Sequence, residues 1–393
     1  MPVVGLEAEF TLLVNGQPQR PEAYFGTPRA LVQAAFAPDA ANEKTASAKI
    51  IPRVGKSCHL PSGGALYFDT GVIEVATGLI ELDGPLGVRR AVRSLWEQIA
   101  AVRRALDMWE RRRGDSLRLQ GFSAHYNFSQ HRANARRLAL TARLLNFFLP
   151  IPTLLLAANR ASTAVGVRPR PGRLEITADF TPDVALTTAT LAFLAGVLDA
   201  VARWPLGDLR PERLATRGVP RLRGFRPSKH SSRKGWRAHV ADFSQNPFTT
   251  DPAAVEWRLQ DGRTLSLRAL ASEVCAAFAP AVRRFADEEI RAHIRDVLAG
   301  EARSLLDFDG RPPAYDDAGR RIDWGRRRSR PLPRSAYERA IRRVLSHRPL
   351  RLDGALWRVE RMPGWYEFVF REVNTGVRRV FNLDQLAARS KRV

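Results

Sequence analysis

The chain has 393 residues, of which 45% are hydrophobic and 26% charged, a composition typical of a globular protein with a large core. Its two cysteines, Cys58 and Cys275, lie far apart in sequence, which argues against a disulfide framework or a cysteine-based zinc site and favours a reducing cytoplasm. The formal net charge of +23 leaves two interpretations open: an incidental Arg-rich surface, or a surface that attracts an anionic partner.

The opening residues, MPVVGLEAEF, do not show the pattern of a secretion signal. The two most apolar stretches, residues 144–158 and 186–202, predict buried helices rather than membrane spans. Prolines break the first stretch, and Asp199 interrupts the second.

The first half of the chain predicts alternating strands and helices. The segment VVGLEAEFTLLV alternates like a strand, and ALYFDTGVIEVAT predicts two short strands around Thr70-Gly71. The pattern then predicts an amphipathic helix over 84–113, a strand at LRLQGFSAHYNFS and a helix over 133–149. A loop over 159–171, a strand at RLEITADF and a buried helix over 182–204 follow.

The second half is more irregular. Residues 205–252 are rich in Pro, Gly and Arg and predict a long ordered excursion or a substrate loop, and helices resume between 266 and 306. A Pro/Arg-rich linker over 311–334 precedes a helix at 335–345 and two strands, WYEFVFREV and GVRRVFNL. We therefore expect a catalytic domain over 1–310 and a small basic accessory domain over 311–393.

The predicted fold class is α+β, with a curved antiparallel sheet, helices on its convex face and acidic strands lining its concave face. In the first strand, Glu7 and Glu9 share one face, whereas Leu6 and Phe10 lie on the other, core-facing side. Two neighbouring carboxylates repel one another unless water or a cation separates them, so this strand indicates either an exposed edge or a metal site.

Three further segments carry polar residues on strands. Asp69 and Glu74 interrupt an otherwise β-branched and aromatic segment. In GFSAHYNFS, His125 shares a face with Ser123 and Asn127, opposite a face expected to bury Phe122, Ala124, Tyr126 and Phe128. In GRLEITADF, the residues that share a polar face are Arg173, Glu175, Thr177 and Asp179. In one sheet, these faces would form a carboxylate-rich basin suited to Mg²⁺, although a lone histidine beside aromatic residues is also common in cores.

The order Gly-x-Glu-x-Glu, an acid-bearing β segment, His-x-Asn and then Arg-Leu-Glu resembles the glutamine-synthetase-like carboxylate-amine ligases. That superfamily includes glutamate-cysteine ligase and the ligases and deamidases of the prokaryotic ubiquitin-like protein. ALYFDTGVIEVAT is particularly similar to the corresponding segment of the last pair, and the resemblance spans about residues 1–200.

The resemblance implies a role for each residue that matches these motifs. The metal ligands would be Glu7, Glu9, Glu74, His125 and Glu175. Asp69 would act as base or nucleophile, and Arg173 would meet phosphate. Thr177 stands where glutamine synthetase has an arginine, so the loop arginines Arg160, Arg168 and Arg170 are further candidates for binding the nucleotide phosphates.

The resemblance thus implies a cytoplasmic, ATP- and Mg²⁺-dependent ligase that forms an amide or isopeptide bond through an acyl phosphate. A deamidase on the same scaffold and an Arg-rich nucleic-acid-binding protein are the alternatives. The dense arginines of Arg203 to Arg237 and Arg320 to Arg351 favour an acidic peptide or protein as one substrate over nucleic acid, and no membrane is expected. The sequence does not indicate the oligomeric state.

Overall fold

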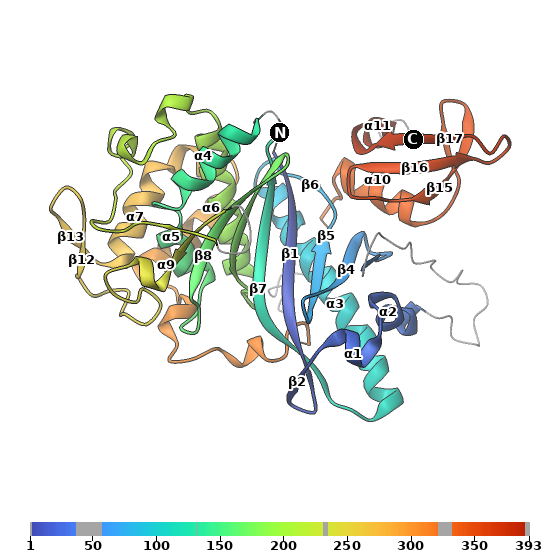
Figure 1. Cartoon of the computed structure of the whole chain (residues 1–393), viewed down its shortest axis with the longest axis horizontal. Coiled ribbons are helices and arrows are strands. Elements are labelled where there is room, and N and C mark those ends of the chain that lie inside the picture. Colours follow the sequence, from blue (N-terminus) through green and yellow to red (C-terminus); the bar gives the residue numbers. More distant parts are fainter. Residues whose placement is uncertain (1, 37–56, 132, 231–234, 321–331, 390–393) are drawn as a thin grey trace. The chain divides into compact units, whose positions relative to one another are not determined.

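The computed structural model describes residues 2–36, 57–131, 133–230, 235–320 and 332–389 (Figure 1). The chain divides into two compact units. Unit 1 comprises Met1–Val4, Leu82–Val92 and Ser123–Tyr315, and unit 2 comprises Gly5–Glu81, Arg93–Phe122 and Asp316–Val393. Three elements have residues in both units: β1 (Val3–Val14), α3 (Pro85–Arg113) and β7 (Leu117–Ser129). The mixture of helices with antiparallel strands confirms the predicted α+β class.

Unit 1 combines antiparallel strands with a helical layer. Its strands are β8 (Ala164–Arg170), β9 (Arg173–Asp179), β10 (Ser228–Lys229), β11 (Trp236–His239), β12 (Trp257–Arg258) and β13 (Thr264–Leu265). Its α-helices are α4 (Ala135–Leu145), α5 (Pro150–Ala157), α6 (Val184–Ala202), α7 (Leu267–Ala277), α8 (Ala279–Val282) and α9 (Glu288–Ala299). The strand order is β10-β11-β8-β9-β7, and α4 and α5 pack against β8 and β9 (Figure 1).

Alternation along these strands separates an apolar face from a polar face. Tyr126, Val167 and Ile176 are at most 2% exposed, because they lie on the face that the helices cover. The next layer is built by α6, which packs against α5, α8 and α9. Gly196 of α6 permits this approach, since a Cβ there would lie 2.6 Å from the Cα of Val282.

By length and composition, α6 could cross a membrane, and the bent pair α4–α5 passes the same test if it is counted as one span. In the structure, 78% of the apolar window of α6 is buried inside the protein. The prediction that residues 186–202 form a buried helix is therefore confirmed.

Unit 2 carries the acidic strands. Its elements before α3 are β2 (Gln17–Gln19), α1 (Pro21–Phe25), α2 (Pro28–Phe36), β3 (Ser57–His59), β4 (Gly64–Asp69), β5 (Val72–Thr77) and β6 (Ile80–Glu81). Its strand order is β1-β5-β4-β3, with β2 and β6 also paired to β1. The two short strands predicted around Thr70-Gly71 are β4 and β5, and Thr70 and Gly71 close a two-residue hairpin between them with positive φ of 49° and 93°.

The C-terminal segment of unit 2 has its own apolar core. The strands β14 (Leu350–Leu352), β15 (Ala355–Arg361), β16 (Glu367–Glu372) and β17 (Arg378–Asn382) form one sheet in chain order. Helices α10 (Ala336–Leu345) and α11 (Leu383–Arg389) share its buried cluster with Trp357, Phe368 and Phe370. The segment also contacts the rest of unit 2, because the Tyr337 amide donates to the Glu81 carboxylate at 3.1 Å. The predicted domain boundary after residue 310 stays a prediction.

Several predicted elements differ from the structure. The predicted loop over 159–171 contains strand β8, and the predicted helix over 133–149 ends at Leu145 before α5 starts at Pro150. Phe122, expected in the core, is 50% exposed. Part of the predicted linker, residues 321–331, lies outside the described residues.

Candidate active site

The acidic strands of unit 2 bring three carboxylates together. Glu9 of β1 stands directly opposite Glu74 of β5, and the hairpin places Asp69 at the end of β4. Oxygen atoms of Glu9, Asp69 and Glu74 lie within 4.8 Å of one another, and all three residues are half-buried. Leu6, Ala8 and Phe10 on the opposite face of β1 are at most 1% exposed, so core packing fixes the direction in which the acidic face points.

Glu7 lies on the same face of β1, but it stands opposite Ala76 rather than opposite an acid. It is outside the group of three carboxylates. Three carboxylates at this separation repel one another, and a divalent cation with oxygen ligands relieves that repulsion. The donor set of Glu9, Asp69 and Glu74 therefore fits Mg²⁺.

The polar face of unit 1 is arranged in rows that cross three strands. Glu175 of β9 stands between Asn127 of β7 and Arg168 of β8. In the next row, Thr177 stands between His125 and Gly166. The polar face predicted from GFSAHYNFS and GRLEITADF is thus present, and β8 adds arginines to it.

Glu175 is 2% exposed and carries two arginine partners. Arg168, which is 7% exposed, forms an ion pair with it, and Arg170 Nε donates to its second oxygen at 3.0 Å. A ring nitrogen of His125 lies 3.4 Å from Arg168 Nη2. The predicted metal ligands His125 and Glu175 therefore lie beside guanidinium groups in unit 1, and their metal role stays a proposal.

The charges around Glu175 set its titration. Burial alone would raise the pKa of its carboxyl, but the hydrogen bond from Arg170 and the charges of Arg168, His125 and Arg170 hold that pKa below its ordinary value. A lowered folded-state pKa contributes stability above the unfolded pKa, and this contribution is lost as the pH falls through the folded pKa.

Replacing Glu175 by Gln is expected to lower the free energy of unfolding by about 3–5 kcal/mol, because Arg168 would stay buried without its counter-charge. Urea denaturation measures this loss. Glu273→Gln is the matched control, since its ion pair with Arg263 is exposed and is expected to contribute less than about 1 kcal/mol. Equal losses in the two variants would contradict a structural role for Glu175.

The other predicted phosphate ligands have partners within unit 1. Arg173 Nε donates to Asn127 Oδ1 at 2.9 Å. Arg160 Nε donates to the Phe308 carbonyl at 3.3 Å. To bind phosphate, either arginine would have to exchange or share these neutral partners.

Asp179 extends the polar face of β9 and was not among the predicted site residues. Its carboxylate accepts the Asn159 side-chain amide at 3.1 Å, and the same amide donates to the Tyr315 hydroxyl at 3.2 Å. Burial raises the pKa of Asp179 to about 7, although the Asn159 backbone N–H and the Arg311 charge act to lower it. The alternation of β9 predicts that Asp179 lies on the polar face. Only the fold shows that the buried Asn159 lies beside it.

A raised pKa in the folded state means that the native protein binds a proton that the unfolded chain has released. Stability should therefore fall as the pH rises from about 4 to about 7. Asp179→Asn, which keeps an acceptor for Asn159, is expected to remove this fall and to raise Tm at pH 8 by on the order of 5 °C. Thermal unfolding at pH 5 and pH 8 checks this, and an unchanged Tm difference between the two pH values would contradict it.

No family model matches the chain, and neither does any curated protein. A solved structure does match it: the crystal structure of the complex between Prokaryotic Ubiquitin-like Protein Pup and its ligase PafA. The match covers 99% of this chain and 92% of that chain, with a TM-score of 0.51 and 13% sequence identity. The chain has the fold of the Pup ligase.

The fold of the Pup ligase agrees with the fold that the sequence motifs imply. At 13% identity, the likeness to the Pup ligase establishes the fold and leaves activity to be argued from the residues.

Proposed function

We propose that the chain is an ATP- and Mg²⁺-dependent carboxylate-amine ligase that forms an amide or isopeptide bond in the cytoplasm. The observation that supports this most is the group of Glu9, Asp69 and Glu74, within 4.8 Å of one another on strands that carry the ligase-like motifs. The Pup-ligase fold of the whole chain agrees with it.

In this proposal Glu9 and Glu74 hold Mg²⁺, with Glu7, His125 and Glu175 as the further candidate ligands. Bound Mg²⁺ would neutralise phosphate charge on ATP. Arg173, with Arg160, Arg168 and Arg170, would meet the phosphates of the nucleotide.

The reaction we propose has two steps. A substrate carboxylate attacks the γ-phosphorus of ATP, which forms an acyl phosphate and releases ADP. The amine then attacks the acyl carbon, and the C–O bond to phosphate breaks as the C–N bond forms. Asp69 accepts the proton that the attacking amine must lose.

Following ADP formation and amide formation together tests this proposal. A ligase releases one ADP for each new C–N bond, whereas a deamidase on the same scaffold would hydrolyse an amide without consuming ATP. A salt-sensitive gel shift with DNA or RNA in the absence of Mg·ATP binding would instead support a nucleic-acid-binding protein.

We further propose that one substrate is an acidic peptide or protein. The Pup ligase was solved with a protein partner, and the excursion after α6 is basic. Its Arg210, Arg213 and Arg226 are exposed and form no ion pair within the described residues, so their charge is available to an anionic partner.

Labelled polyglutamate is expected to bind the full chain with an affinity that falls about tenfold or more between about 50 and 300 mM NaCl. Arg210→Glu combined with Arg213→Glu should weaken binding at low salt, because it reverses two exposed charges. Fluorescence anisotropy measures both effects. Salt-independent binding, or preference for an oligonucleotide of equal charge, would contradict an acidic polypeptide partner.

A further inference from the structure

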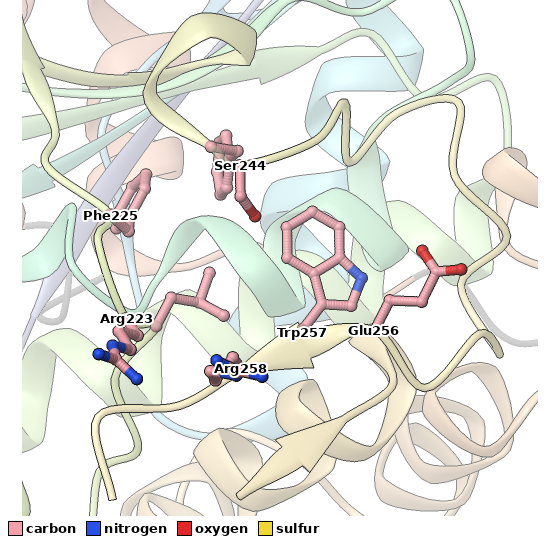
Figure 2. Close-up of a pocket in the computed structure, with 8 residues that line it drawn as sticks. Arg223, Phe225, Ser244, Glu256, Trp257 and Arg258 are labelled. Carbon is pink, nitrogen blue, oxygen red and sulfur yellow. The ribbon is translucent and has the colours of Figure 1, made fainter. Parts of the chain in front are cut away.

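A pocket lies in unit 1 where the basic excursion, residues 205–252, meets β12, and none of its lining residues has a role in the proposed ligase reaction (Figure 2). Its volume is about 210 Å³. The lining residues come from two short segments and the loop between them: Leu222, Arg223, Phe225, Phe243, Ser244, Glu256, Trp257 and Arg258.

Three aromatic rings form the walls of the pocket. The Phe225 and Phe243 rings are stacked with centroids 4.5 Å apart, and Phe243 meets the Trp257 ring edge to face at 6.1 Å. Phe225 is 7% exposed and Trp257 is 1% exposed, so neighbouring residues hold these walls in place. Such a surface binds a flat apolar group by contact with its faces and edges.

Two arginines stand directly opposite one another beside these walls. An antiparallel bridge joins Leu222 to Leu259, and the Arg223 amide donates to the Arg258 carbonyl at 2.9 Å. Like charges in this cross-strand position repel. No ion pair is recorded for either side chain in the part of the chain that the structure describes, and Figure 2 shows the Glu256 carboxylate on the far side of Trp257 from both.

The size of the pocket limits what can fill it. An apolar cavity of about 150 Å³ accepts benzene. Pockets for drug-sized ligands start at about 300 Å³. A volume of about 210 Å³ therefore suits one ring with a small substituent. An anionic substituent would relieve the repulsion between Arg223 and Arg258, whereas an ammonium group in the same aromatic site would add to it.

We propose that this pocket binds a single-ring aromatic carboxylate, with the ring against Phe225 and Phe243, which the buried Trp257 supports from behind, and the carboxylate between Arg223 and Arg258. The pocket shares no residue with the carboxylate group on β1, β4 and β5, so it does not depend on the ligase proposal.

Calorimetry with phenylacetate and its neutral counterpart phenylacetamide tests the assignment on the full chain without ATP or Mg²⁺. Phenylacetate should bind about tenfold more tightly or better, because only the acid offers a charged partner to the guanidinium groups. Arg223→Gln and Arg258→Gln should each remove most of this preference. Arg283→Gln, an exposed arginine that lies outside the excursion and does not line the pocket, should keep it.

A further variant separates the contribution of the aromatic walls to binding from that of the arginine charges. Phe225→Ala should weaken both compounds and leave the preference for the acid, and if it fails to fold, the exposed arginine variants still decide the question. Equal affinity for acid and amide, an unchanged preference in both arginine variants, or no heat from either compound up to about 20 mM would overturn the assignment. Tight binding of adenosine monophosphate with the same arginine dependence, and none of phenylacetate, would overturn it in favour of a nucleotide.

Discussion

Glu9→Gln is expected to weaken Mg·ATP binding by about a hundredfold while the fold stays intact. Loss of an outer-shell partner typically weakens metal binding by about 10–100-fold, and loss of a ligand should reach at least the upper end of that range. Gln keeps the shape of the side chain but removes the charge that faces Glu74 and Asp69. Calorimetry measures the affinity, and circular dichroism checks the fold.

Two controls sharpen this prediction. Glu7→Gln should have a smaller effect, because Glu7 stands opposite Ala76 and outside the group of three carboxylates. Glu367→Gln, on an exposed position of β16, should have none. Equal nucleotide affinity in Glu9→Gln and the wild type would contradict a metal site on β1.

Asp69→Asn is expected to lower product formation by about 10²–10⁴-fold and to leave ATP affinity nearly unchanged. This is the pattern of a group that acts as a base in the transition state rather than in ground-state binding. Single-turnover measurements of amide formation, with calorimetry of ATP on the same variant, separate the two effects.

In the structure, an Asp69 oxygen lies within 4.8 Å of oxygens of Glu9 and Glu74. A carboxylate at that position can also be a metal ligand. If Asp69→Asn loses as much nucleotide affinity as Glu9→Gln, Asp69 belongs to the metal site and another residue must accept the proton.

The elements with strong local signals could be predicted from the sequence. Alternation in VVGLEAEFTLLV identified β1 and the acidic face carrying Glu9, since Leu6 and Phe10 can only be core. The β-rich pattern around Thr70-Gly71 predicted β4 and β5, and the positive φ of both residues in the structure closes the hairpin between them. Such local patterns could not predict that Glu9 stands opposite Glu74, because this pairing follows from the strand order β1-β5-β4.

Strand β8 could not be predicted in this way. Its sequence AVGVRPR contains a proline and two arginines, which are typical of a loop when its pairing with β11 and β9 is unknown. Arg168 and Arg170 were therefore identified only as loop candidates for phosphate. Their pairing with Glu175 depends on the register of β8 against β9, which places Arg168 directly opposite that carboxylate.

The pocket between the basic excursion and β12 could not be predicted from sequence patterns either. Phe225, Phe243 and Trp257 are separated along the chain by irregular segments with no shared period, and tertiary packing alone brings their rings together. Composition indicated only that residues 205–252 are basic and ordered.

Calorimetric titration of ATP into the full-length chain, with and without Mg²⁺, tests the central claim most directly. We predict saturable binding with Mg²⁺ and a large loss of affinity without it, because the carboxylates of Glu9, Asp69 and Glu74 repel the nucleotide phosphates unless a cation stands between them. Nucleotide binding that is equally strong without Mg²⁺, or no binding under either condition, would contradict a metal-dependent ligase.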